Sequence, residues 1–404
     1  MIARLQADPL RAALAQFPVV VLTGARQVGK TTLARWLLPE ADYVSLDDPA
    51  RAEQARLTPS QFLRERATPA IIDEVHYAPD LFRHLKIAVD ENRTPGRFLV
   101  TTGSQTFGLM AGVSESLAGR AAVFTLPPLS IAEVSAAPSL VDTDAFLWRS
   151  GYPELWHRPE LDRDLWMGSY VATYLERDVR QVLQVGDLRD FDRFLRAAAL
   201  RSARLLSYAD LARDVGIAPN TAKRWTSVLE ASQQVFLLEP YHRHRTKRLI
   251  KSPKLYFSDA GLLCFLMGFR EAADLPRHAL WGAVWETFVI AEVRKRLLAA
   301  GHPPPLWFWR TAHGAEVDLL VETAPETFIA IECKTAERVT PAALAGVNRL
   351  REEYGQRAIR AALVACRTVR PYPLGEEATR AGIPRAVPVA GPSGLLEAVE
   401  LALT

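Results

Sequence analysis

A phosphate-binding motif lies near the start of the sequence, directly after a short apolar run. Two glycines, a lysine and a threonine stand at the spacing G-x-x-x-x-G-K-S/T. Glycines let successive backbone N–H groups turn toward a phosphate, and the following helix presents its positive end to the anion. We expect Lys30 to reach the β- and γ-phosphates and Thr31 to coordinate Mg²⁺. The predicted nucleotide-binding loop comprises Gly24, Ala25, Arg26, Gln27, Val28, Gly29, Lys30, Thr31 and Thr32.

Two adjacent carboxylates end a later apolar run. Ile71 and Ile72 are followed by Asp73 and Glu74, in a segment where apolar runs and helical stretches alternate. In P-loop enzymes the first such acid holds Mg²⁺ through water, and the second can activate the attacking water. The sequence therefore predicts Asp73 as a metal-binding residue and Glu74 as the catalytic base.

Further polar residues of this region could act on a bound nucleotide. Ser104 follows the apolar run Phe98–Thr101, at the carboxyl end of a predicted strand, where open α/β sheets bind ligands. Ser104 or Thr102 could sense the γ-phosphate, or the residue there could cap the next helix. Arg120 could act as an arginine finger on the phosphate of a neighbouring subunit, or it could form a salt bridge within its own chain.

The elements that must position these residues are strands that alternate with helices. Such alternation predicts a mainly parallel sheet covered on both faces. Five strands would fit the core of a P-loop NTPase. The predicted strands are Val19–Leu22, Tyr43–Leu46, Ala70–Ile72, Phe98–Thr101 and Ala122–Leu126.

The motifs together resemble one group of AAA-type ATPases from bacteria and archaea that carry a C-terminal domain of unknown function. The resemblance covers nearly the whole chain. It implies an AAA+ core with a P-loop, a magnesium-binding acid and a sensor strand, followed by a helical lid that contains YLERDV. The segments that carry it are GARQVGKTT, SLDDP, IIDEVHYAPDLF, TTGSQ, SLAGR and LPPLS.

The middle of the sequence predicts a DNA-binding unit. Residues 207–225 read as two helices joined by a glycine turn, with helix-start signals at Ser207 and Pro219. This is a helix-turn-helix outline, and the basic segment that follows would be the wing of a winged helix. The segment could bind phosphates with little sequence selectivity, or it could be a solvated face paired with acids elsewhere. Its cations are Arg243, Arg245, Lys247, Arg248, Lys251 and Lys254.

The C-terminal part contains acids and a lysine in the order that a metal-dependent nuclease requires. Glu286 lies on the predicted helix Trp281–Leu298, and Asp318 and Glu332 lie on consecutive strands, with Lys334 two residues further on. This order resembles the PD-(D/E)xK restriction-endonuclease superfamily. Two neighbouring carboxylates can hold a divalent cation, with Glu286 as a further ligand, and Lys334 can polarise an attacking water. Alternatively, Asp318 caps a turn and Glu332 only pairs with Lys334.

Composition limits the remaining possibilities. The chain has 404 residues and a net charge of only +3, so several domains are expected and any nucleic-acid surface must be local. The three cysteines are far apart and form no CxxC pair, which argues against a zinc site and suits a reducing compartment. No apolar run approaches the roughly 18 residues of a membrane span. We therefore expect a cytoplasmic protein with no membrane partner.

These observations predict an α/β protein with four parts. They are a P-loop AAA+ core (1–140), a helical lid (141–195), a winged-helix-like domain (196–254) and an α/β restriction-endonuclease-like domain (255–404). The expected function is ATP- and Mg²⁺-dependent action on DNA by a homo-oligomer, with possible cleavage by the C-terminal site. Two alternatives stay open: a nucleotide-switched DNA- or protein-binding module without nuclease activity, and a signalling ATPase with no nucleic-acid role.

Overall fold

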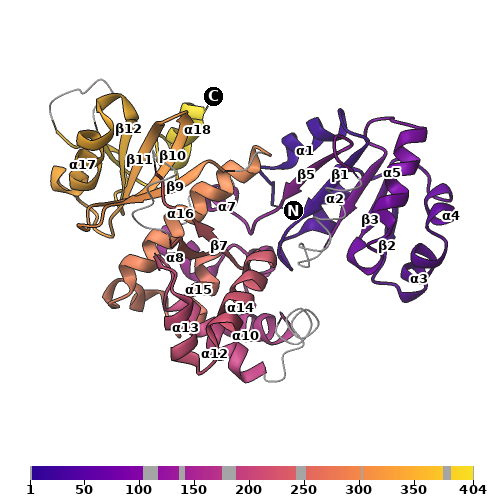
Figure 1. The fold of residues 1–404 in the computed structure, drawn as a ribbon, viewed down its shortest axis with the longest axis horizontal. Coiled ribbons are helices and arrows are strands. Elements are labelled where there is room, and N and C mark those ends of the chain that lie inside the picture. The colour runs from indigo at the N-terminus through magenta and orange to yellow at the C-terminus, as the bar shows by residue number, and fades with distance from the viewer. Residues whose placement is uncertain are drawn as a thin grey trace.

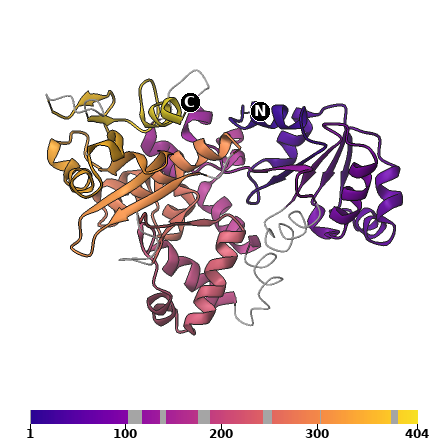
Figure 2. The same ribbon diagram turned by 45° about the horizontal axis from the view of Figure 1, so that its top comes forward.

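Three parts make up the fold, two built on β-sheets and one mainly helical (Figure 1). The computed structural model describes residues 2–102, 117–135, 142–174, 188–242, 252–301, 304–375 and 384–403. In Figure 1 the N-terminal part lies on the right in indigo, the C-terminal sheet lies on the left in orange and yellow, and the mainly helical part lies below. Figure 2 shows the same arrangement from a second direction.

Five parallel strands form the N-terminal sheet, in the order β2-β3-β4-β1-β5. Alternate residues of β1 face opposite sides: Val20 packs with helices α1 and α2, whereas Val21 packs with α3, α4 and α5. The prediction of a parallel sheet with both faces covered is confirmed. The elements are α1 (Ala7–Leu14), β1 (Val19–Thr23), α2 (Lys30–Leu37), β2 (Asp42–Ser45), α3 (Pro49–Leu57), α4 (Pro59–Arg64), β3 (Ala70–Asp73), η1 (Val75–Tyr77), α5 (Leu81–Glu91), β4 (Phe98–Thr101) and β5 (Ala121–Thr125).

The middle part consists of helices around a small antiparallel sheet of order β6-β8-β7. Ser207 caps α13 by accepting a hydrogen bond from the Asp210 backbone N–H, and Gly216 ends this helix with a φ of 84°. Strand β8 belongs to this sheet, so the expected boundary at residue 255 falls inside it. The elements are α7 (Ile131–Ser135), α8 (Thr143–Arg149), α9 (Pro153–His157), α10 (Arg163–Tyr174), α12 (Leu188–Ala199), β6 (Arg204–Leu205), α13 (Tyr208–Val215), α14 (Pro219–Ala231), β7 (Val235–Leu238), β8 (Lys254–Phe257), α15 (Ala260–Leu266) and η3 (Ala272–Arg277).

A mixed six-stranded sheet of order β13-β14-β12-β11-β10-β9 forms the C-terminal part. Helix α16 packs on the face that contains Leu319 and Ile331, and α17 packs on the face that contains Leu320 and Ala330. No helix in the described ranges is long and apolar enough to cross a lipid bilayer. The elements are α16 (Trp281–Ala299), β9 (Leu306–Arg310), β10 (Glu316–Ala324), β11 (Thr327–Cys333), η4 (Pro341–Leu344), α17 (Ala345–Tyr354), η5 (Gln356–Ala358), β12 (Ile359–Ala365), β13 (Tyr372–Pro373), β14 (Arg385–Val387) and α18 (Leu395–Leu403).

Buried ion pairs join the N-terminal part to helix α16. Arg4 donates to Glu133 at 3.0 Å, and its guanidinium also donates to the backbone carbonyls of Val28 and Pro127. Nearby, Lys295 of α16 donates to Glu292 at 2.7 Å, and Glu292 accepts the backbone N–H of Ile131 at 2.8 Å. These four charged side chains are at most 8% exposed. They therefore fix the segment after β5 between the phosphate-binding loop and α16.

Removal of Arg4 tests the importance of this buried network. We expect Arg4→Met to lower the free energy of unfolding by about 3–5 kcal/mol, because it leaves the Glu133 carboxylate buried without its cation. Combining it with Glu133→Gln should cost less than Arg4→Met alone. The matched control is Arg11→Met, whose surface ion pair with Asp8 should contribute at most about 1 kcal/mol. Urea titration measures all four proteins, and equal losses for Arg4→Met and Arg11→Met would contradict the expectation.

Candidate functional site

The loop between β1 and α2 has the backbone conformation that its glycines allow. Gly24 has a φ of +146°, and a Cβ atom there would lie 2.4 Å from the backbone oxygen of Leu126. Gly29 precedes α2 with a φ of +92°. Lys30 is 7% exposed, and its ammonium donates to the carbonyls of Gly24 (3.0 Å) and Ala25 (2.8 Å). The lysine thus lies over the loop, where a phosphate would offer it stronger acceptors than these carbonyls.

Asp73, at the carboxyl end of β3, accepts hydrogen bonds from several hydroxyl groups. Its Oδ2 atom accepts hydrogen bonds from Thr31 and from Tyr43, both at 2.8 Å, and its Oδ1 atom accepts one from Thr101. Burial, followed by the hydrogen bond with Asp73, raises the pKa of Tyr43 to about 12. The sequence predicted that Thr31 and Asp73 act together, and the structure brings them into contact. It did not predict Tyr43, which belongs to no recognised motif, and it assigned no role to Thr101, the first residue of the TTGSQ segment.

Glu74 occupies an unusual backbone position beside this cluster. Its φ of 56° lies in the left-handed region, which few residues other than glycine adopt. The Glu74 carboxylate lies 3.0 Å from Nδ1 of His76. Burial raises the pKa of Glu74, but the hydrogen bond with His76 and the charges of Lys30 and Arg26 outweigh it, so the pKa lies below its ordinary value. Glu74 is therefore ionised at neutral pH, as a base must be.

A pocket of about 310 Å³ adjoins the start of α2. Helix α9 provides one wall, and the segment after β5 provides another. Gly29 lies close to this helix, since a Cβ atom there would be 3.8 Å from Cγ of Pro153. The phosphate-binding motif indicated only the side of this pocket that its own residues form, because the rest of the lining comes from three other segments. The lining residues are Ile2, Arg4, Val28, Gly29, Thr32, Leu33, Leu129, Pro153, Glu154 and His157.

The structure places some of the other residues predicted for the ATPase and DNA-binding units, and the rest lie outside the described residues. Arg120 forms the intramolecular alternative: it donates to both carboxylate oxygens of Asp90, at 2.7 and 3.0 Å. The structure corrects the prediction for Lys254, which is 3% exposed and pairs with glutamates instead of facing solvent. The remaining predicted contacts lie outside the described residues: Ser104, Arg243, Arg245, Lys247, Arg248 and Lys251.

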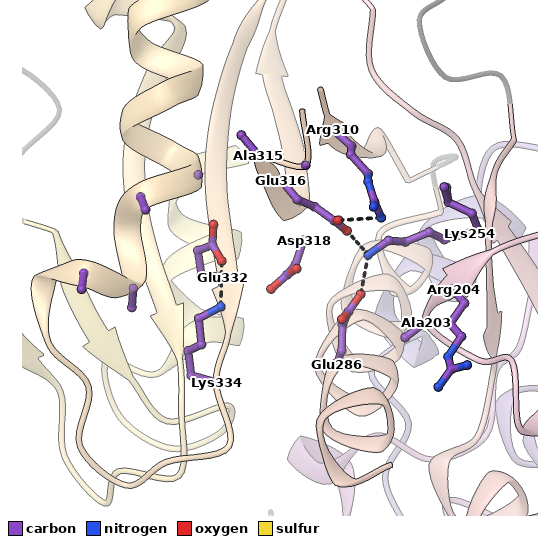
Figure 3. A pocket seen from close by; sticks show the side chains of 16 residues that line it. Ala203, Arg204, Lys254, Glu286, Arg310, Ala315, Glu316, Asp318, Glu332 and Lys334 are labelled. Atoms are coloured by element: carbon purple, nitrogen blue, oxygen red, sulfur yellow. Dashed lines mark hydrogen bonds and ion pairs between the residues drawn. The ribbon is translucent and has the colours of Figure 1, made fainter. Parts of the chain in front are cut away.

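A second pocket, of about 740 Å³, contains the predicted acids of the C-terminal part (Figure 3). Strands β10 and β11 pair with Leu319 opposite Ile331, and the same register places Asp318 opposite Glu332. Asp318 accepts the backbone N–H of Cys333 at 2.8 Å, and Lys334 donates to Oε2 of Glu332 at 3.1 Å. The structure thus brings together Asp318, Glu332 and Lys334, as the sequence predicted.

One carboxylate oxygen of Glu332 lacks a hydrogen-bond partner in the part of the chain that the structure describes. The residue is 4% exposed, and its Oε1 atom has no hydrogen-bond partner among the described residues. Burial, and then the charge of Asp318, raise the pKa of Glu332 to about 8. Burial raises the pKa of Asp318 as well. Two buried carboxyl groups with raised pKa values indicate a position where a cation would be stabilising.

Glu286, which the sequence predicted as a further metal ligand, is instead paired with protein donors. Its Oε1 atom accepts hydrogen bonds from Lys254 at 2.8 Å and from Tyr256 at 2.6 Å. Burial, followed by the charge of Asp318, raises its pKa to about 7 despite these donors. Within the part of the chain that the structure describes, no three or more His, Cys, Asp or Glu residues lie in a metal-binding group. Glu316, the fourth carboxylate of this pocket, is paired with Lys254 and Arg310. The carboxylates of the pocket that remain for a cation are therefore Asp318 and Glu332.

Sequence comparison assigns three successive segments to protein families. Residues 16–135 match an AAA domain. Residues 141–273 match a domain of unknown function (DUF8612), and residues 281–387 match another domain of unknown function (DUF4143). The AAA match contains the whole phosphate-binding loop together with Asp73 and Glu74. It supports the P-loop ATPase that the motifs predicted, whereas the C-terminal match does not test the nuclease-like prediction.

Two solved structures show only a distant likeness. The Walker-type ATPase PABY2304 of Pyrococcus abyssi aligns with a TM-score of 0.41 and 15% identity, over 66% of this chain and 96% of that chain. A signal transduction ATPase with numerous domains and a tetratricopeptide repeat sensor, PH0952 from Pyrococcus horikoshii, aligns with a TM-score of 0.22 and 12% identity, over 74% of this chain and 45% of that chain. The family assignment rests on sequence instead.

Two curated proteins are much closer in sequence. The uncharacterized protein Rv2008c of Mycobacterium tuberculosis is 36% identical over 315 residues, which are 78% of this chain and 69% of that protein. The uncharacterized protein Mb2031c of Mycobacterium bovis matches with the same identity and coverage. The chain therefore belongs to the family of these mycobacterial proteins, and its N-terminal part is an AAA-type P-loop ATPase domain.

Proposed function

We propose that the N-terminal site binds ATP with Mg²⁺ and that Glu74 activates the water that attacks the γ-phosphate. The observation that carries this proposal is the convergence of Lys30, Thr31, Asp73 and Glu74 at one edge of the parallel sheet. Ligands of open α/β sheets bind at the carboxyl ends of the strands. The lowered pKa of Glu74 keeps its carboxyl group ionised, which is the form that a base needs.

The residues present fit Mg²⁺. The hydroxyl of Thr31 and the carboxylate of Asp73 are in contact at 2.8 Å, and both supply the oxygen ligands that this ion prefers. When bound, Mg²⁺ would neutralise charge that develops on the phosphate oxygens. Lys30 would exchange its carbonyl acceptors for phosphate oxygens. His76, 3.0 Å from Glu74, would hold the carboxylate in position for the water.

The pocket of about 310 Å³ is where the nucleoside would lie. It adjoins the start of α2, so a phosphate chain held at the loop can extend directly into it. Its lining combines apolar side chains with a few polar groups, including Glu154 and His157, which is the usual composition of a small-molecule site.

Two substitutions separate ATP binding from hydrolysis. Lys30→Ala should weaken ATP binding, because it removes the cation that contacts the phosphates. Glu74→Gln should preserve binding and lower turnover by about 10²- to 10⁴-fold, because an amide cannot accept the proton of water. Binding is measured with a fluorescent ATP analogue, and turnover is measured as phosphate release.

The matched controls for this experiment are Lys86→Ala on α5 and Glu53→Gln on α3. Both should bind and hydrolyse ATP at the wild-type level, since neither lies in the nucleotide site. Wild-type turnover by Glu74→Gln would show that another group activates the water.

The C-terminal pocket favours a second function, metal-dependent cleavage of a phosphodiester. Asp318 and Glu332 lie opposite each other, and within the described part of the chain Oε1 of Glu332 is buried without a hydrogen-bond partner. This donor set fits a hard divalent cation, whose remaining ligands would be water and substrate oxygens. When bound, such an ion would lower the pKa of the attacking water and polarise a phosphoryl oxygen. Lys334, with a side chain 41% exposed, would contact the phosphate from the open side.

DNA is the proposed substrate of this second site. Arg204 of β6 lines the same pocket and would attract a phosphate backbone. The helix pair α13–α14 follows β6 directly in the chain, and these helices would be a further contact for the DNA. The contacts predicted for the basic segment stay predictions.

Cleavage is tested with supercoiled DNA and Mg²⁺ or Mn²⁺. We expect wild-type protein to nick the DNA, and Asp318→Asn or Lys334→Met to lower the rate by about 10²-fold or more, because each removes a group at the reacting phosphate. ATP hydrolysis by both variants should stay at the wild-type level. Glu337→Gln, on the exposed segment after β11, is the matched control. If wild-type protein cuts no duplex, single-stranded or branched DNA, the nucleotide-switched binding module replaces the nuclease.

A further inference from the structure

Four carboxylates line the C-terminal pocket, and they form two pairs. A lysine lies between the members of one pair but not between those of the other. Asp318 and Glu332 form one pair, and Glu286 and Glu316 form the other. Figure 3 shows that the Lys254 side chain extends between Glu286 and Glu316. Its ammonium lies 2.8 Å from Oε1 of Glu286 and is also ion-paired with Oε1 of Glu316.

Strand pairing and burial hold Lys254 in this position. It lies on β8, where it pairs with Leu205 of β6 and with Leu238 of β7. The residue is 3% exposed, and its ammonium lies 5.5 Å from the centre of the Phe308 ring. A buried lysine normally loses its charge, but the two glutamates hold the Lys254 pKa above its ordinary value although burial opposes them. The lysine is therefore a permanent cation in the pocket.

Additional donors complete the pairing of the two glutamates. Tyr256 donates to Oε1 of Glu286 at 2.6 Å, and Arg310 lies 3.1 Å from Oε2 of Glu316. The pair of Asp318 and Glu332 is less fully paired. Asp318 accepts the N–H of Cys333 and Oε2 of Glu332 accepts from Lys334, but Oε1 of Glu332 is buried and has no hydrogen-bond partner among the described residues. The pocket thus has one carboxylate pair joined by a buried lysine, and one pair, called here the open pair, that keeps a buried acceptor oxygen for a cation.

We propose that Lys254 takes the place of a second metal ion, so that the C-terminal pocket binds a single divalent cation, at Asp318 and Glu332. Two-metal phosphodiesterase sites hold their ions about 3.5–4 Å apart between shared carboxylates. Here the ammonium of Lys254 performs the charge neutralisation of one of those ions. It acts as a positioning residue, because it holds Glu286 and Glu316 away from the open pair. This inference rests on the metal site proposed above.

Counting bound Mn²⁺ tests the inference. Nucleotide-free, full-length protein is equilibrated with Mn²⁺, and the ions bound per chain are measured by calorimetry and by electron paramagnetic resonance. Lys254→Met keeps most of the unbranched side chain but removes its charge. It should bind one more Mn²⁺ than wild type, and the two ions in its pocket should show magnetic coupling that the wild type lacks. Any Mn²⁺ bound at Asp73 is common to all samples and cancels in the comparison.

Two further variants distinguish this inference from the proposed metal site. Lys254→Met combined with Glu316→Gln should return to the wild-type count, because the freed carboxylate pair is lost. Asp318→Asn should bind one Mn²⁺ fewer than wild type. A loss with Asp318→Asn but no gain with Lys254→Met would overturn the role of Lys254 and keep the metal site. A gain with Lys254→Met but no loss with Asp318→Asn would support Lys254 as a cation substitute and reject the metal site at Asp318.

The wild-type spectrum tests the single-ion part of the inference even if Lys254→Met does not fold. Circular dichroism reports whether the variant is folded. An isolated Mn²⁺ signal in the wild-type pocket, lost in Asp318→Asn, supports the inference. A magnetically coupled pair of ions in the wild-type pocket overturns it.

Discussion

The buried pair of Glu292 and Lys295 on helix α16 is the interaction on which the arrangement of the chain depends. Lys295 also donates to the carbonyl of Leu129, and Glu292 accepts the N–H of Ile131. These hydrogen bonds attach helix α16 to the segment that follows β5 of the ATPase sheet. Burial raises the pKa of Glu292, while Lys295 and the Ile131 N–H oppose that shift. Removing two charges from water is costly unless every partner is supplied, and here both partners are on the same helix turn. The pair is therefore fully hydrogen-bonded only when α16 packs on the segment after β5 in this arrangement.

The same helix connects the two candidate sites. Glu286 lies on α16 at the C-terminal pocket, and Glu292 lies on it at the junction with the ATPase part. From there, the contacts continue through Ser130 and Glu133 to Arg4, which donates to the carbonyl of Val28 in the phosphate-binding loop. A hydrogen-bonded series of buried groups thus runs between the loop and the helix. A movement of the loop on nucleotide binding would act on groups that have no water to replace their lost partners.

Local patterns in the sequence predicted the strands well but not the long-range polar contacts. The predicted strand Phe98–Thr101 has the observed bounds, and Val19–Leu22 ends one residue early, because a buried parallel strand is a continuous apolar run between polar turns. The phosphate-binding loop could be predicted because its chemistry requires fixed residue types at fixed spacing. Arg4 could not be predicted, since its partners lie 24, 123 and 129 residues away and no periodicity records them.

Lys254 shows most clearly why the C-terminal site was only partly predictable. In the sequence it ends a basic segment, and proximity suggested a shared role with those cations. In the structure, the pairing of β8 with β6 and β7 turns it toward Glu286 and Glu316, away from solvent. The lysine belongs to the segment that matches one family, and the glutamates belong to the segment that matches another. The charge balance of the pocket is therefore a property of the two segments together, and neither segment alone contains the groups that set it.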